Sequence, residues 1–327
     1  MRRRDLVALL GGAAALTFYV KPGVAQSSSR VWRIGYLSTR ACPNELSDSL
    51  VKGLRELGYV EHTNLLVELR GAAGKNDRLS ALAAELVDAK VDLIATEGTP
   101  ATQAVLRATT LIPIVFGSAQ DPVEKGLVAS LAHPGGNATG TALVADQSKH
   151  LALLKEAVPT ISQVVFLYDP ATRPGAYGES SLKMLRDHAA RLGVRVHPVT
   201  LRDADETERL FTTFPAATDG LVVENSAINL VAQDRICRLA TERRLPAVGT
   251  FGSFTSAGCL MSYGENLPAV YRRAAAYVDK ILRGSKPSDL PVMQATTFEL
   301  AINLKAAKAI GLEVSPALLA RADEVIE

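Results

Sequence analysis

From about residue 31 onward, short runs of apolar, often β-branched residues alternate with stretches in which apolar residues recur every three or four positions. Runs of the first kind predict buried strands, and stretches of the second kind predict amphipathic helices. In residues 46–57, for example, the apolar positions are Leu46, Leu50, Val51, Leu54 and Leu57, which share one helix face. The repeated alternation predicts an α/β fold with parallel sheets covered by helices on both faces.

The pattern predicts strands in both halves of the chain, at residues 31–37, 64–69, 92–96, 113–117, 138–143, 164–168, 194–199, 220–224 and 247–250. It predicts helices at residues 46–57, 78–89, 123–131, 180–192 and 230–243. Beyond residue 250, SAGCLMSYG predicts a strand, LPAVYRRAAAYVDKILRG a long helix ended by Gly284, and TFELAINLKAAKAIGL a strand followed by a helix.

Three local phrases occur twice in the same order, which indicates an internal repeat. RELGYV is echoed by ARLGVR, KVDLIATEGTPA by ATDGLVVENSAI, and LIPIVFGSA by RLPAVGTFG. We therefore expect two topologically similar lobes that face each other across a cleft, with the carboxyl ends of their strands at the ligand site. The elements after residue 250 would complete both sheets in turn, giving several crossovers.

The N-terminus predicts export from the cytoplasm. Residues 1–26 contain the basic start MRRRDL, the apolar run VALLGGAAALTFYV and the small-residue end GVAQ, which together are typical of a signal peptide. Arg3 and Arg4 also fit the twin-arginine form, and the choice between the two export routes stays open. The apolar run is shorter than the ~20 residues that a membrane span needs. We expect a periplasmic protein, cleaved near Ala25 and Gln26.

Composition and motifs exclude several other functions. Lys plus Arg number 36 against 34 Asp plus Glu, so no basic surplus indicates nucleic-acid binding. The five histidines have no metal-ligand spacing, and no G-x-S-x-G, H-E-x-x-H or paired-carboxylate signature is present, so we expect no metal, no cofactor and no enzymatic activity. Cys42, Cys237 and Cys259 are an odd number without C-x-x-C spacing, which argues against a disulfide framework; a Cys42–Cys259 bridge stays open.

Several long phrases resemble one known family. LRELGYVE, IPIVF, DPVEKGLVASLAHPGGNATGT, RLPAVG, GCLMSYG, YRRAAAYVDKILRGSKPSDLPV and FELAINLKAAKAIGL with LLARADEVIE are similar to the ABC-transporter substrate-binding proteins related to the tryptophan/tyrosine-binding TrpX proteins. The resemblance runs from about Arg33 to Glu327. It implies a type I periplasmic-binding-protein fold: two Rossmann-like lobes joined by three hinge crossovers.

The resemblance also implies a domain division and a role. It places the first lobe at residues 31–143 plus 251–290 and the second at residues 144–250 plus 291–327. A monomer of this type captures a small solute between the lobes and delivers it to an ABC permease in the inner membrane. The solute itself does not follow from the fold. A sensing module for a signalling partner and an exported two-lobed enzyme are the alternative functions.

Polar residues at strand ends and helix N-termini are the candidate ligand contacts, because unpaired backbone N–H groups there attract carboxylates. The candidates are Ser38, Thr39, Gly98, Thr99, Ser118, Gln120, Asp121, Tyr168, Tyr177, Asn225, Ser226 and Phe251. Each of three has an alternative structural role. Thr99 would cap its own helix, Asp121 would either pair with a ligand ammonium or cap residues 123–131, and Phe251 would either stack on an aromatic ligand or pack between the lobes.

These candidates favour an amino acid or a related carboxylate, with an apolar or aromatic side chain, as the solute. Where the family often has an Asp at a strand end of the second lobe, this chain reads Glu224-Asn225-Ser226. That departure leaves the identity of the ligand open.

The signal peptide generates the first testable prediction. N-terminal sequencing of the protein from a periplasmic fraction should give a sequence that starts at about Gln26, because processing follows the small residues of GVAQ. An intact Met1 on the exported soluble protein would contradict the prediction.

Overall fold

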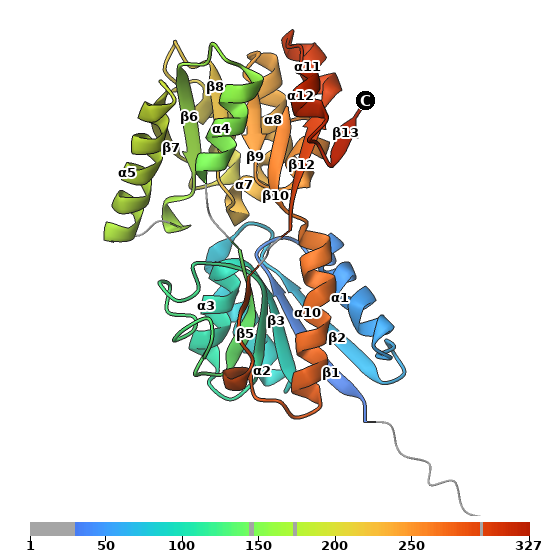
Figure 1. Ribbon diagram of the computed structural model, residues 1–327. Coiled ribbons are helices and arrows are strands. Elements are labelled where there is room, and N and C mark those ends of the chain that lie inside the picture. Colours follow the sequence, from blue (N-terminus) through green and yellow to red (C-terminus); the bar gives the residue numbers. More distant parts are fainter. Residues whose placement is uncertain (1–29, 144–146, 173–174, 295–296) are drawn as a thin grey trace, which may run out of the picture. The chain divides into compact units, whose positions relative to one another are not determined.

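Two sheets organise the computed structural model, which describes residues 30–143, 147–172, 175–294 and 297–327. The expected signal peptide at residues 1–26 lies outside the described residues. Residues Val31–Glu327 form one compact unit. The first sheet has the strand order β11-β5-β4-β3-β1-β2, and the second has the order β13-β12-β10-β9-β8-β6-β7 (Figure 1). We call each sheet and the helices packed on it a lobe.

All strand pairs of the first sheet are parallel, and in the second sheet only β10 and β12 run antiparallel to each other. The first lobe consists of β1 (Trp32–Ser38), α1 (Glu45–Glu56), β2 (Leu65–Gly71), α2 (Leu79–Asp88), β3 (Leu93–Glu97), α3 (Gly98–Ala108), β4 (Ile114–Gln120), β5 (Ala138–Leu143), α10 (Leu267–Leu282) and β11 (Met293–Gln294). Because parallel strands align their carboxyl ends, the ends of β1, β3 and β4 meet at one edge.

The second lobe repeats this arrangement. It consists of α4 (Gln147–Ala157), β6 (Gln163–Tyr168), α5 (Gly175–Arg191), β7 (Arg195–Thr200), α6 (Thr207–Phe211), β8 (Gly220–Val223), α7 (Ala227–Val231), α8 (Gln233–Glu242), β9 (Ala247–Gly249), α9 (Gly252–Ser256), β10 (Met261–Glu265), β12 (Phe298–Asn303), α11 (Leu304–Ile310), α12 (Pro316–Leu319) and β13 (Glu324–Ile326). The prediction of an α/β fold with two lobes built on mostly parallel sheets is confirmed.

One predicted helix is wrong. Residues 123–131 form turns, not a helix, so Asp121 caps no helix there. The backbone reverses at Asp121, whose φ is +44°, and again at Gly126, whose φ is +67°. The N–H groups of Leu127 and Val128 both donate to the carbonyl of Pro122, which closes a compact turn in place of a helical ladder. The predicted helix at 230–243 is also interrupted, because α7 ends at Val231 and α8 begins at Gln233.

The chain passes between the two sheets three times: between β5 and α4, between β10 and α10, and between β11 and β12. The expected boundaries therefore need two corrections. Residues 252–265 lie with the second sheet, because β10 pairs with β9 and with β12. Residues 293–294 lie with the first sheet, because β11 pairs with β5.

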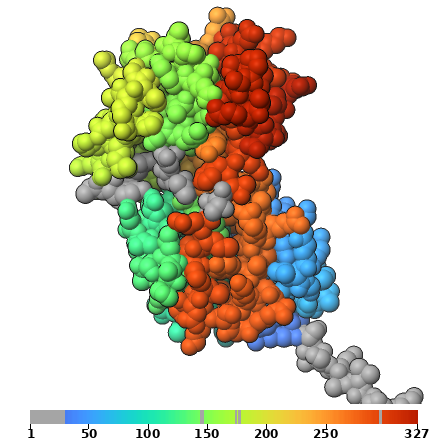
Figure 2. Space-filling view, viewed as in Figure 1, coloured from blue at the N-terminus to red at the C-terminus, as the bar shows by residue number. Residues whose placement is uncertain are grey.

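Helix α10 returns to the first lobe and packs on α1, although more than 200 residues separate them in sequence; Figure 2 shows α10 in orange beside α1 in blue. The guanidinium of Arg272 bonds the carboxylate of Glu56 at 2.8 Å, and the hydroxyl of Tyr59 donates to Asp279 at 2.8 Å. Gly53 permits the close approach, since a Cβ there would lie 2.3 Å from the carbonyl oxygen of Arg272. Among the described residues, no helix is long and apolar enough to cross a membrane.

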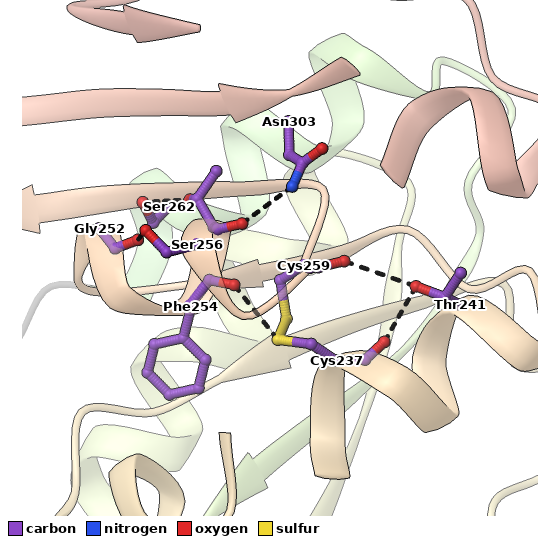
Figure 3. Close-up of a disulfide and its surroundings, with 10 residues drawn as sticks. Cys237, Thr241, Gly252, Phe254, Ser256, Cys259, Ser262 and Asn303 are labelled. Carbon is purple, nitrogen blue, oxygen red and sulfur yellow. Dashed lines mark hydrogen bonds between the residues drawn. A yellow bond between two sulfur atoms is a disulfide. The ribbon is translucent and has the colours of Figure 1, made fainter. Parts of the chain in front are cut away.

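A disulfide joins Cys237 of α8 to Cys259, which precedes β10 (Figure 3). The expected absence of a disulfide is wrong, and so is the alternative Cys42–Cys259 bridge: Cys42 is a free thiol of the first lobe. The reason is tertiary, because the chain from β9 through α9 folds back so that the two Cα atoms are 4.6 Å apart. Sγ of Cys237 also lies 3.3 Å from the carbonyl oxygen of Phe254.

The disulfide closes a sequence separation of 22 residues. Replacing both Cys237 and Cys259 with alanine should lower the free energy of unfolding by roughly 2–5 kcal/mol, because the unfolded chain regains the entropy that the cross-link removes. Denaturant unfolding measures the change, and Cys42→Ser serves as the control with little expected effect. Titration of three free thiols in the denatured, unreduced wild type would contradict the pairing.

Candidate functional site

A cavity lies between the carboxyl ends of the two sheets. Its empty volume is about 740 Å³, counted with the open solvent at its mouth. The first lobe contributes polar side chains and the first turn of α3, and the second lobe contributes Asp169, Thr172 and the start of α7. The cavity therefore has polar groups from two directions, as a captured solute requires.

Most of the predicted contact residues line this cavity. They are Thr39, Gly98, Thr99, Ser118, Gln120, Asn225, Ser226 and Phe251. Ser38, Asp121 and Tyr168 are not among its lining residues. Tyr168 instead stacks on Phe166, with ring centroids 5.6 Å apart, in the core of the second lobe. Tyr177 lies in α5, and its side chain is outside the described part of the structure.

Three charged residues of the wall, Glu97, Lys125 and Asp169, were absent from the predicted set. Glu97 ends β3, and Asp169 directly follows β6. Ligands of open α/β sheets bind at the carboxyl ends of strands, so the positions of Glu97 and Asp169 in the sequence were enough to predict both as wall residues. Lys125 lies in the turn that replaces the expected helix, so no sequence pattern placed it at the cavity.

Glu97 is only 3% exposed, and four side chains donate to its carboxylate. Oε2 accepts from the hydroxyls of Tyr36 at 3.0 Å and Ser38 at 2.7 Å, and from the amide of Asn44 at 3.2 Å. Oε1 accepts from Nε of Arg40 at 2.5 Å. A buried carboxylate needs such partners, because an unpaired charge away from water costs several kcal/mol. Glu97 is thus held in the wall with its charge balanced.

Burial and the Glu97 carboxylate together raise the pKa of neighbouring hydroxyl and thiol groups. Burial, then the Glu97 charge, raises the pKa of both Tyr36 and Tyr271 well above the ordinary tyrosine value. The same two causes raise the pKa of the Cys42 thiol to about 11. These hydroxyl and thiol groups are neutral at physiological pH, so Arg40 supplies the charge that opposes Glu97.

Helix α3 starts at Gly98, two residues before the expected position, and its N-cap is Glu97. The expectation that Thr99 caps α3 is therefore wrong: its hydroxyl accepts from the N–H of Gln120 at 3.2 Å. The side chain of Glu97 makes no cap bond either. The N-terminus of α3 thus has no side-chain cap, and Gly98 and Thr99 line the cavity there.

Tyr271 of α10 positions Ser118, another residue of the wall. The two hydroxyls are 2.7 Å apart, and the Tyr271 hydroxyl also donates to the carbonyl of Thr96 at 3.3 Å. The ring packs closely against Gly117, where a Cβ would lie 2.3 Å from ring carbons. Only glycine leaves space for this ring beneath β4.

The second lobe contributes Asp169, which is 2% exposed. Its Oδ1 accepts from the N–H of Ala171 at 2.8 Å, and its own N–H donates to Glu224 at 3.0 Å. Burial raises the pKa of the Asp169 carboxyl above its ordinary value, while the Ala171 hydrogen bond and the charges of Arg202 and Lys125 oppose that rise.

Two further contacts of the second lobe shape the cavity. Ser226 caps α7 by accepting from the N–H of Asn229 at 3.1 Å, as its position at a helix start predicts. The side-chain amide of Gln120 in the first lobe donates to the carbonyl of Asn225 at 2.6 Å. This hydrogen bond links the two lobes directly beside the cavity.

Much of the remaining wall is apolar. Leu46, Leu143, Leu230, Phe251 and Leu267 line it. Phe251 is 3% exposed and belongs to the core cluster of the first lobe, although the residues after it lie with the second sheet. The cavity therefore combines charged groups of both signs with an apolar region. Among the described residues, no group of His, Cys, Asp and Glu has the arrangement of a metal site.

Comparisons with known proteins agree with this architecture. The family described as "ABC transporter substrate binding protein" matches residues 42–326. The chain is 26% identical over 263 residues to the tyrosine-binding protein of Clostridioides difficile (strain R20291), a match that covers 80% of this chain and 75% of that protein.

Two solved structures are similar over 90% of this chain and 100% of their own. A conserved domain protein from Vibrio cholerae has a TM-score of 0.84 at 27% identity. The ABC domain from Streptococcus pneumoniae, solved in complex with L-Trp, has a TM-score of 0.83 at 22% identity. At this identity, the similarity to the Streptococcus pneumoniae domain is a similarity of fold.

Proposed function

This chain belongs to the family of ABC transporter substrate-binding proteins, and we propose that it captures an amino acid with an apolar or aromatic side chain for an ABC importer. The observation that carries the proposal is the composition of the cavity wall. Lys125 and Asp169 supply one charge of each sign, and leucines with Phe251 supply an apolar region. A zwitterionic α-amino acid with an apolar side chain complements this combination.

Asp169 is the proposed partner of the ligand ammonium. Its carboxylate is buried and lies in the wall, so an ammonium beside it would form a charge-assisted hydrogen bond of low solvent exposure. The uncapped N-terminus of α3, with Thr99 and Lys125, is the proposed site of the ligand carboxylate. Helix N-termini favour anions, because their free N–H groups and the helix dipole both attract negative charge.

The names of two similar proteins support the choice of an aromatic solute: one is a tyrosine-binding protein, and the other was solved with L-Trp. We further propose that the protein acts as a monomer in the periplasm after removal of its signal peptide and delivers the solute to a permease in the inner membrane. The three passages of the chain between the sheets suit a hinge that closes on the solute.

The ligand proposal predicts that the wild-type protein binds aromatic or apolar amino acids in isothermal titration calorimetry. Asp169→Asn should weaken this binding at least about 30-fold, because losing a buried charged partner costs about 2–5 kcal/mol. Asparagine keeps an oxygen for the Ala171 N–H, so the loop should hold its conformation. Asp121→Asn is the matched control, because Asp121 is not in the wall, and its affinity should stay near that of the wild type.

The pH dependence of the binding affinity, measured in the same experiment, distinguishes the effect of the Asp169 charge from the effect of its shape. The ligand ammonium needs ionised Asp169, so affinity should fall as pH decreases through a pKa above that of an ordinary aspartate. A raised native pKa also means that the carboxylate costs stability at neutral pH, so unliganded Asp169→Asn should be at least as stable as wild type. Binding of sugars or nucleosides, but of no amino acid, in a thermal-shift screen would refute the ligand class.

The hinge generates a separate prediction. Small-angle scattering should show a smaller radius of gyration at saturating ligand than without it, because closure brings two lobes together that are connected by three passages of the chain. Asp169→Asn at the same ligand concentration is the control, and its radius of gyration should decrease less than that of the wild type. An unchanged wild-type profile at saturation would contradict closure on the ligand.

A further inference from the structure

Arg40 lies beside the cavity and not in its wall. It follows Thr39, a residue of the wall, in the segment between β1 and α1. Its side chain is 22% exposed and contacts the carboxylate of Glu97, whose side chain is 4% exposed. Arg40 also lines the adjoining groove, which shares Leu46 and Phe251 with the cavity. Arg40 is therefore placed to set the charge that a solute meets without touching the solute.

Arg40 offsets part of the negative charge around the cavity, to which the buried Glu224 beside Asp169 and Thr172 also contributes. The charged side chains of the wall are Glu97, Lys125 and Asp169, two negative and one positive. Tyr36, Ser38 and Asn44 donate hydrogen bonds to Glu97 but carry no charge, whereas Arg40 carries one positive charge. Arg202 also acts on Asp169, but it is exposed, and solvent screens it.

We propose that Arg40 is a specificity-determining residue: by pairing with Glu97 it offsets negative charge beside the cavity and so favours zwitterionic solutes over cationic amines of the same shape. The choice of zwitterion rests on the function proposed above, whereas the charge-balancing role of Arg40 rests on its contact with Glu97. The positive charge of Arg40 repels a cationic amine in the low dielectric of the cavity. Without Arg40 the surroundings of the cavity would be more negative and would attract that amine more strongly.

The contacts of Arg40 and Glu97 allow variants that separate the charge of Arg40 from its geometry. In Arg40→Gln the carboxylate of Glu97 keeps its three other hydrogen-bond donors, Tyr36, Ser38 and Asn44. Arg40→Lys keeps the charge and loses the geometry of the guanidinium. The double variant Arg40→Gln with Glu97→Gln removes both charges and leaves the summed charge of the pair unchanged. Arg70→Gln is the matched control, since it removes the same charge in the same lobe from a surface pair with Glu85.

The test compares two pairs of probes that differ by one carboxylate: L-tryptophan with tryptamine, and L-tyrosine with tyramine. Calorimetry at neutral pH gives the ratio of amino-acid to amine affinity for each variant, and circular dichroism verifies folding. Arg40→Gln should lower this ratio roughly tenfold or more by gaining affinity for the amine. Arg40→Lys, Arg70→Gln and the double variant should keep the wild-type ratio.

Several outcomes would overturn the proposal. An equal loss of affinity for both members of a probe pair in Arg40→Gln would show a purely structural role. A ratio that also changes in Arg40→Lys would show that geometry, not charge, determines selection. If wild type binds no amino acid but Arg40→Gln gains amine binding, the proposed ligand class fails while the role of Arg40 stands. If no variant binds any of the four probes, both are refuted.

Discussion

The buried carboxylate of Glu97 is the constraint on which the ligand-facing edge of the first lobe depends. Its charge lies almost out of contact with water, so partners must come to it. Tyr36 and Ser38 come from β1, Arg40 from the following segment, and Asn44 from the start of α1. The same Asn44 accepts from two N–H groups of the first turn of α1. One carboxylate thereby sets the positions of β1, α1 and α3, and with them Thr39, Gly98 and Thr99.

The second lobe uses the corresponding glutamate of the internal repeat. Glu224 follows β8 as Glu97 ends β3, and its carboxylate accepts from the N–H of Asp169 at 3.0 Å and the hydroxyl of Thr172 at 3.0 Å. The repeat also pairs Asp92 with Asp219, and each of these accepts from a backbone N–H at the start of a neighbouring strand. The duplicated phrases thus share two structural roles. The aspartates bond the first residues of a neighbouring strand, and the glutamates bond the segments that carry wall residues of the cavity.

Other parts of the site depend on segments that return from far along the chain. Tyr271 of α10 reaches beneath β4 to bond Ser118, and this contact requires both the crossing after β10 and a glycine at position 117. The disulfide similarly depends on the course of the chain through β9 and α9, which brings Cys259 to α8. In the expected lobe division, residues 251–265 lay in the first lobe, which would have separated these two cysteines.

The amino-acid sequence by itself determined the strands and helices with strong periodicity, the two-lobed α/β class, the internal repeat and most polar residues of the cavity wall. These follow from local patterns, because a period of apolar positions specifies an element and parallel strands bring their ends to one edge. Tertiary structure alone decided the turn at 121–126 that carries Lys125, the lobe to which β10 and β11 belong, the pairing of Cys237 with Cys259, and the partner of each buried charge. Those outcomes depend on which distant segments meet, and neither periodicity nor residue spacing contains that information.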